Sequence, residues 1–351
     1  MMKLSTMQAV VSTVDERWES RLADQILSHW EHDAERAKYW RASANFVFFF
    51  KRFGLDHVLR FNHESERTAG EIQAELDYVN ELARSGLHVA KPVQSLAGAA
   101  VESIDTSQGV FHAVVFETLR GKQVDLVELA PAQIVAWGNA LGELHNVAAQ
   151  RSYSGRPTWK EHLDFVSQAL PADETVARRA LDELEEQLGQ LAVDERNFGL
   201  IHFDFELDNL VWEEIAWAGQ KPGIIDFDDC ARYWFVADIA FALRDLFGDS
   251  AANVDFQNES LMGFVQGYRS VRPIDPDELL LIPLFLRLHN LLTLAKLQRT
   301  LTPVDPAGEL PWMAELRAKL AAKMDFYRHE LARTQAVACL PLAIGMADRQ
   351  A

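Results

Sequence analysis

A histidine, two aspartates and an asparagine interrupt two apolar stretches of the chain. They are His202, Asp204, Asn209 and Asp226. A strand buried in a protein core normally excludes such side chains, because burying a polar group or a charge without a partner is unfavourable. Something must therefore satisfy these four side chains, and a reaction centre is one reason for a protein to keep them.

The spacing of these residues predicts a site for a hard cation. Segments 210–215 and 221–226 can pair as a hairpin around residues 217–220, which would place Asn209 and Asp226 roughly opposite each other. An amide and a carboxylate suit Mg²⁺, whose remaining ligands would be ATP phosphates and water. Together the side chains favour the chemistry of phosphoryl transfer, which needs mainly positioning and charge neutralisation.

Asp204 has a different expected role, because it lies on the loop that leads into the hairpin. It can point toward the same cavity without binding the ion, and could accept a proton from an attacking hydroxyl or amine. The alternative is that these residues only form hydrogen bonds around a turn, with Asp204 and Asp208 as ordinary loop residues. A later Asn and a strand-borne Asp are independent requirements met together, which favours chemistry.

The apolar pattern predicts an α+β protein with two domains. A small β-rich domain is expected over 1–120 and a larger, mainly helical one over 121–351, because strand periodicity gives way to helix periodicity after about residue 124. The elements that must position the polar loop are a helix at 15–40, strands at 46–50 and 57–61, a helix at 68–85, strands at 99–104 and 111–118, helices at 131–147 and 172–191, and a β insertion at 199–227.

Composition narrows the classes of protein and partner. The 351 residues carry a formal charge of −18, which repels nucleic acid and anionic membrane surfaces. Two cysteines are too few for a disulfide framework, and no apolar run reaches the roughly 20 residues of a membrane helix. We expect a cytoplasmic protein without nucleic-acid or membrane partners; the oligomeric state is left open.

The spacing His202-x-Asp204 with Asn209 five residues on, followed by Ile225-Asp226-Phe227, resembles the aminoglycoside phosphotransferase and choline kinase family. The resemblance implies a bilobal fold of the protein-kinase type. It also implies that Asp204 is the catalytic base, that His202 braces the catalytic loop, and that Asn209 and Asp226 hold Mg²⁺. A second metal role is open for Asp228.

The first domain is also similar to this family. By that resemblance Arg60 takes the place of the kinase lysine that binds the ATP phosphates, and Glu75 holds it in position. The loop around Ser43 would cover the phosphates, although it lacks the expected glycine. The stretch from Glu117 to Leu119 would be the hinge, where backbone groups pair with adenine.

The resemblance implies an ATP- and Mg²⁺-dependent kinase that acts on a hydroxyl of a small molecule: an amino alcohol, amino acid, sugar or aminoglycoside-like compound. It also implies that Asp238 anchors the backbone of the catalytic loop. Two alternatives stay open. One is a serine/threonine protein kinase of the bacterial stress-response type, and the other is a catalytically silent nucleotide-binding protein of the same fold.

Overall fold

The computed structural model describes the whole chain except residues 152, 214–220, 302–309 and 336–351. The chain divides into two compact units, Met1–Leu119 with Arg299–Ala321 and Arg120–Gln298 with Ala322–Ala351. The sequence-based division into 1–120 and 121–351 did not group residues 299–321 with the first unit. The assignment of a separate role to each domain stays a prediction.

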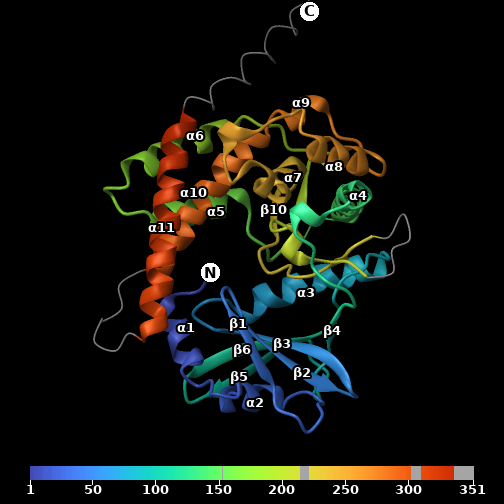
Figure 1. Ribbon diagram of the computed structural model, residues 1–351, viewed down its shortest axis with the longest axis vertical. Coiled ribbons are helices and arrows are strands. Elements are labelled where there is room, and N and C mark those ends of the chain that lie inside the picture. Colours follow the sequence, from blue (N-terminus) through green and yellow to red (C-terminus); the bar gives the residue numbers. More distant parts are fainter. Residues whose placement is uncertain (152, 214–220, 302–309, 336–351) are drawn as a thin grey trace, which may run out of the picture. The chain divides into compact units, whose positions relative to one another are not determined.

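The first unit is built on an antiparallel sheet (Figure 1) with the strand order β1-β2-β3-β6-β4, in which β5 also pairs with β6. Figure 1 shows α3 and α2 on opposite faces of this sheet. The elements are α1 (Leu4–Val11), α2 (Arg21–Leu27), β1 (Lys38–Ala42), β2 (Phe46–Arg52), β3 (Leu55–His63), α3 (Ala69–Arg84), β4 (Pro92–Val93), β5 (Glu102–Thr106) and β6 (Gly109–Glu117).

Local sequence signals account for the centre of this unit. The expected hairpin is confirmed, because β2 and β3 pair around a turn in which Gly54 has a φ of 72°. The helix expected at 68–85 is confirmed as α3, whose capping box joins Thr68 and Glu71. Aromatic rings fill the sheet core, including Phe48 stacked on Phe61 at 5.6 Å.

The single helix expected at 15–40 is wrong. The structure has a short helix, α2, which begins after the cap Ser20, and a strand, β1. Pairing of Lys38–Ala42 with β2 explains the difference, because that non-local contact outweighs the helical pattern of the charged residues.

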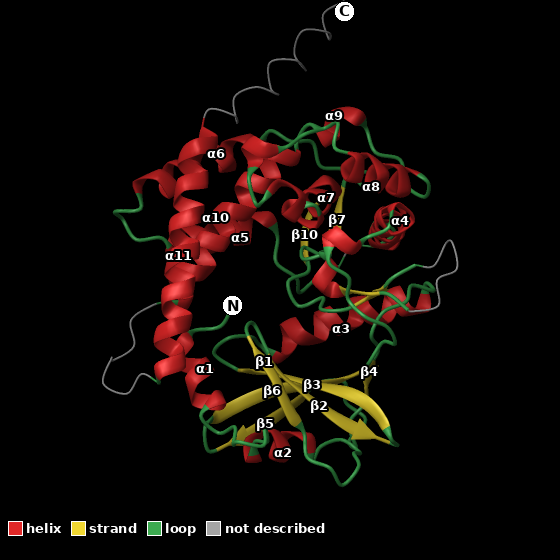
Figure 2. Ribbon diagram, viewed as in Figure 1, coloured by secondary structure: helices red, strands yellow, loops and turns green. Residues whose placement is uncertain are grey.

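The second unit is mainly helical (Figure 2), and its described part contains two short strand pairs, β7 with β10 and β8 with β9. The helices expected at 131–147 and 172–191 are confirmed as α4 and α6. From residue 126 onward the elements are η1 (Leu126–Glu128), α4 (Pro131–Ala148), α5 (Trp159–Ala169), α6 (Thr175–Gly189), β7 (Phe198–Ile201), η2 (Leu207–Asn209), β8 (Leu210–Val211), β9 (Gly223–Ile224), β10 (Ala231–Trp234), α7 (Phe235–Ala242), η3 (Arg244–Phe247), η4 (Ala251–Asn253), α8 (Glu259–Arg269), α9 (Pro276–Leu279), α10 (Ile282–Thr300) and α11 (Pro311–Arg333). The end of α10 and the first half of α11, within residues 299–321, belong to the first unit.

Residues 276–300 are helical over a length, and with an apolar content, that would suffice to cross a membrane. However, 61% of the apolar window is buried within the protein. A core helix of a soluble protein meets the same two criteria.

Helices α4 and α8 approach so closely that their backbones touch. A Cβ atom on Gly138 would lie 1.9 Å from the carbonyl oxygen of Phe264, and one on Gly267 would lie 1.9 Å from that of Val135. Real Cβ atoms do not come so near to a carbonyl, so glycine is required at both positions. The crossing therefore depends on two glycines, one from each helix.

We expect Gly138→Ala to lower the free energy of unfolding by about 3 kcal/mol, because the methyl group must push the two backbones apart. Urea denaturation would measure the loss. Gly263→Ala on α8 is the matched control. Its Cβ would meet an Ile134 methyl group at 3.4 Å, an ordinary van der Waals contact, so a change within about 1 kcal/mol is expected. Equal effects of the two variants would contradict the close crossing.

Candidate active site

Short strands and an irregular loop carry the polar residues of the second unit. β7 pairs with β10, and β8 pairs with β9. Between β7 and β8 the chain runs through residues 202–206 and the 3-10 turn η2. His202, Asp204 and Asn209 thus lie on this loop, and Asp226 follows β9. Loops held by a rigid scaffold commonly carry functional residues.

Two non-glycine residues of this region have a left-handed backbone. The φ angle is 74° at Phe203 and 64° at Asp226. Such a conformation costs about 1–3 kcal/mol and persists only where the surroundings enforce it. The strain lies next to Asp204 and at Asp226 itself, which supports a functional site at these positions.

The buried carboxylate of Asp238 holds the strained loop. Oδ2 accepts the backbone N–H of His202 at 2.8 Å, and Oδ1 accepts that of Phe203 at 2.9 Å. Nε2 of His145, on α4, lies 3.0 Å from Oδ2. Burial lowers the pKa of His145 despite the opposing effect of Asp238, so the ring is neutral near pH 7 and donates through Nε2. Asp238 therefore contacts the backbone of the loop that the resemblance implied it would anchor.

His202 links the loop to the strand pair that follows it. Its Nε2 donates to the carbonyl of Ile225 at 3.0 Å, and its Nδ1 accepts the backbone N–H of Asp204 at 3.3 Å. The side chain is fully buried. The ring thus joins the backbone beside Asp204 to the residue that precedes Asp226. This is the contact that a bracing residue needs, and the bracing role itself stays a prediction.

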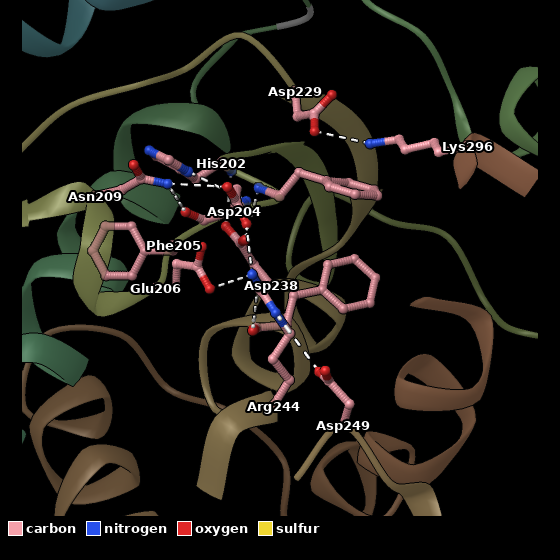
Figure 3. Close-up of polar contacts among 12 residues, drawn as sticks. His202, Asp204, Phe205, Glu206, Asn209, Asp229, Asp238, Arg244, Asp249 and Lys296 are labelled. Carbon is pink, nitrogen blue, oxygen red and sulfur yellow. Dashed lines mark hydrogen bonds and ion pairs between the residues drawn. The ribbon is translucent and has the colours of Figure 1, made fainter. Parts of the chain in front are cut away.

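Asp204 and Asn209 are in direct contact (Figure 3). Nδ2 of Asn209 donates to Oδ2 of Asp204 at 3.0 Å and to the Asp204 carbonyl at 2.9 Å. Because both bonds use the amide nitrogen, the amide oxygen Oδ1 is left for another partner. That oxygen is the atom of an asparagine that can bind a cation.

The register of the strand pair differs by one residue from the expectation. Leu210 lies opposite Ile224, and the backbone N–H of Ile225 donates to the carbonyl of Asn209 at 3.0 Å. Asn209 is therefore opposite Ile225, and Asp226 comes one residue later, where its left-handed φ redirects the chain. The described strands are also shorter than the segments 210–215 and 221–226, and the expected turn at 217–220 lies outside the described residues.

The oxygen ligands available here fit a cation that is also bound by a nucleotide better than a metal site made of protein side chains alone. In the described part of the chain, no three His, Cys, Asp or Glu side chains gather as a metal-binding group. Asn209 and Asp226 would contribute an amide oxygen and a carboxylate, which are ligands that Mg²⁺ prefers. An ion held by so few side chains requires further oxygens, and the phosphates of a nucleotide would supply them.

The stretch after Asp226 is held by contacts of its own. Arg156 donates from Nη2 to the carbonyl of Asp228 and from Nε to that of Cys230. The neighbouring Asp229 pairs with Lys296 of α10 at 2.8 Å. Burial lowers the pKa of Lys296, but the carboxylates of Asp229, Asp204 and Asp228 together raise it above its ordinary value, so the lysine is charged. These contacts position the backbone of Asp228, whose second metal role stays a prediction.

Sequence reasoning missed Glu206 and Arg244. Nη2 of Arg244 lies 2.9 Å from Oδ1 of Asp204 and also contacts Oε2 of Glu206 (Figure 3). Burial, and then the charge of Asp204, raise the pKa of Glu206 to about 7 against the lowering effect of Arg244. One signal was available, because Arg244 follows the apolar run 239–243 and a charge in such a setting needs a partner.

The first unit contains the predicted phosphate-binding pair. Nη2 of Arg60, on β3, lies 2.6 Å from Oε1 of Glu75, on α3, and both side chains are buried. Arg67 contacts the other oxygen, Oε2, at 3.1 Å. The structure thus brings Arg60 and Glu75 together, and their role toward ATP stays a prediction.

The other residues expected to meet the nucleotide lie at loop and strand ends of the first unit. Ser43 is on the loop between β1 and β2, where its N–H donates to the carbonyl of Asn45 at 3.1 Å. Glu117 is the last residue of β6, with its N–H bonded to the carbonyl of Lys91 at 2.9 Å. Leu119 is half-buried just beyond it. Their contacts with a nucleotide remain predictions.

An antiparallel sheet unit and a mainly helical unit that carries a His-x-Asp loop define a bilobal fold of the protein-kinase type. Comparison with known proteins confirms this class. A model of the phosphotransferase enzyme family APH matches residues 20–274, and the chain belongs to this family. It is therefore a phosphotransferase, as the resemblance implied.

Named relatives include kinases for several small molecules. The chain is 26% identical to amicoumacin kinase of Bacillus subtilis (strain 168), over 78% of this chain and 83% of the relative. It is 27% identical to homoserine kinase of Methylobacillus glycogenes, over 61% and 64%. A solved amicoumacin kinase in complex with AMP-PNP, Ca²⁺ and Ami is 25% identical, with a TM-score of 0.74, over 93% of this chain and 96% of that one.

Proposed function

We propose that this phosphotransferase moves the γ-phosphoryl group of ATP to a hydroxyl of a small molecule, with Mg²⁺ as the metal ion. The names of its relatives support a small-molecule acceptor, since they include kinases of amicoumacin and of homoserine. The structure of a relative was solved in complex with AMP-PNP and Ca²⁺, which supports the use of ATP and a divalent cation.

The observation that carries the proposal is the arrangement of Asp204 and Asn209 on a loop anchored by Asp238. In this proposal Asp204 accepts the proton of the acceptor hydroxyl, and its carboxylate is oriented by Asn209 at 3.0 Å. Oδ1 of Asn209 and the carboxylate of Asp226 would hold Mg²⁺. When bound, the cation would neutralise charge on the phosphates.

The direct test is a screen of ATP consumption over amino alcohols, amino acids, sugars and antibiotics with the purified protein. A member that stimulates ADP release and gains a phosphoryl group would support the proposal. Phosphate on an added protein, with none on any small molecule, would favour the protein-kinase alternative. A thermal-shift measurement with ATP and Mg²⁺ would test the catalytically silent alternative, which predicts stabilisation by nucleotide without turnover.

We expect Arg60→Lys to raise the KM for ATP about tenfold, which corresponds to 1.4 kcal/mol of binding free energy. Lysine keeps the charge that Glu75 requires but loses the paired donors with which a guanidinium binds phosphate oxygens. Steady-state kinetics at varied ATP concentration would measure the change.

Arg67→Lys is the matched control, because Arg67 contacts the same Glu75 carboxylate at 3.1 Å but has no predicted role toward ATP. Its KM for ATP should stay within about twofold of the unmodified protein, since a twofold change is well under 1 kcal/mol. A similar rise of KM in both variants would show that the buried ion pair, and not phosphate binding, is responsible.

A further inference from the structure

Arg244 connects the helical core of the second unit to the carboxylate of Asp204. Its side chain is 11% exposed, and Nη1 donates to the carbonyl of Phe241, in α7, at 3.0 Å. Nη2 reaches Oδ1 of Asp204 at 2.9 Å and also Oε2 of Glu206 (Figure 3). The guanidinium is therefore fixed by the protein backbone at one end and holds two carboxylates of the loop at the other.

The two oxygens of Asp204 are thus held by two different residues. Arg244 donates to Oδ1 and Asn209 donates to Oδ2. A carboxylate held at both oxygens cannot rotate about its χ2 torsion without breaking one of the bonds. Each oxygen has two acceptor positions, and the side chain is 33% exposed. Asp204 can therefore accept a further proton donor while its orientation stays fixed.

We propose that Arg244 is a positioning residue for phosphoryl transfer, which sets the direction of the Asp204 carboxylate toward the acceptor hydroxyl. The inference rests on the proposed function, in which Asp204 is the base. It adds a role for a residue 40 positions away in sequence, on η3. Positioning matters here because misplacing a reacting group by about 1 Å can lower a rate about 100-fold.

The charges around Arg244 support a fixed, ionised clamp. Burial lowers the pKa of the guanidinium, but the carboxylates of Asp204 and Glu206, and then Asp245 and Asp249, raise it above its ordinary value. Arg244 therefore stays protonated at any working pH. Without it, the pKa of Glu206, already raised by burial and by Asp204, would rise further. Oδ1 of Asp204 would lose the donor that fixes it, and the carboxylate could turn about χ2.

The experiment compares Arg244→Met and Arg244→Lys with Asp204→Asn and with the control Arg287→Met. Arg287 is also a buried arginine, with a side chain 2% exposed, and it pairs with Glu183 on α6. The readouts are ADP release from MgATP, with water as acceptor and with the panel member that stimulates it most, and the affinity for AMP-PNP. Unfolding by urea reports the stability of each variant.

We expect Arg244→Met to lower kcat about 100-fold, with the KM for ATP and the AMP-PNP affinity within about twofold. Arg244→Lys should recover about a tenth of the original kcat, because an ammonium keeps the charge but not the fork of donors. Arg287→Met should keep kcat per folded molecule, whatever its stability.

Several results would overturn the inference. Full kcat of Arg244→Met beside an inactive Asp204→Asn would remove the role of Arg244 and leave the proposed function standing. A loss of kcat that only follows the loss of AMP-PNP binding and of folded protein would reduce Arg244 to a structural residue. Full turnover by Asp204→Asn would instead overturn the proposed function itself.

Discussion

Asp204→Asn is expected to lower kcat by about 10²- to 10⁴-fold, the range that a positioned base contributes. The asparagine fits the same space but cannot take the proton of the attacking hydroxyl. Its single oxygen can accept from either Arg244 or Asn209, but not from both in the present geometry. Arg244 keeps Glu206 as a partner, so we expect the fold to survive and the affinity for AMP-PNP to change little.

The matched control is Asp208→Asn, four residues further along the same loop. Asp208 is exposed, and its contact with Gln123 uses the backbone carbonyl. Removing the Asp208 charge should therefore leave kcat within about threefold, which is less than 1 kcal/mol of activation free energy. The rate of phosphoryl transfer to the acceptor found in the screen, measured under single-turnover conditions, would separate chemistry from product release. Undiminished transfer by Asp204→Asn would refute its assignment as the base.

Elements defined by local signals could be predicted from the sequence. The hairpin of β2 and β3 follows from apolar runs on either side of a turn with Gly54, and α3 follows from a 3.6-residue apolar pattern after the Thr68 cap. The family spacing from His202 to Asn209 was equally local, and it led to the correct fold class and family.

What the sequence could not predict depends on non-local contacts. Lys38–Ala42 becomes a strand because β2 lies beside it, not because of its own pattern. The one-residue offset between Asn209 and Asp226 arises from the pairing of β8 with β9, which a hairpin drawn from sequence leaves undetermined. Arg244 is 40 residues from Asp204, and no local pattern connects the two.

The acceptor is undetermined for a related reason. The residues of the family motif are predicted to act on the phosphate and the proton, and one fold can keep such groups while its substrates differ. We expect acceptor choice to depend on side chains from several helices of the second unit, which no short motif records. The relatives agree with this point, because the chain is similar both to an amicoumacin kinase and to a homoserine kinase, whose names give different acceptors.

Asp238→Asn is expected to lower the free energy of unfolding by about 3–5 kcal/mol, as for a buried charge network that loses one partner. The Asp238 carboxylate accepts from the N–H groups of His202 and Phe203 and from Nε2 of His145. An asparagine has one acceptor oxygen, and its NH₂ group would face a donor. At least one buried N–H would be left without a partner.

The surface acid Asp325 offers a control, since its side chain is 67% exposed and pairs with Arg328 one helical turn away. Asp325→Asn should change the unfolding free energy by no more than about 0.5 kcal/mol. An unfolding midpoint of Asp238→Asn equal to that of this control would contradict the anchoring role of Asp238.

Asp238→Asn should lose more activity than its loss of folded protein can explain. The left-handed φ of Phe203 costs free energy that the bonds to Asp238 offset, so a weaker anchor lets the backbone relax and moves Asp204, the next residue. We therefore expect kcat per folded molecule to fall at least tenfold even at low temperature, where the variant remains folded. The loop is strained without any bound substrate, and the bonds from Asp238 hold it in that conformation. We therefore expect the orientation of Asp204 to depend on Asp238 even when no substrate is bound.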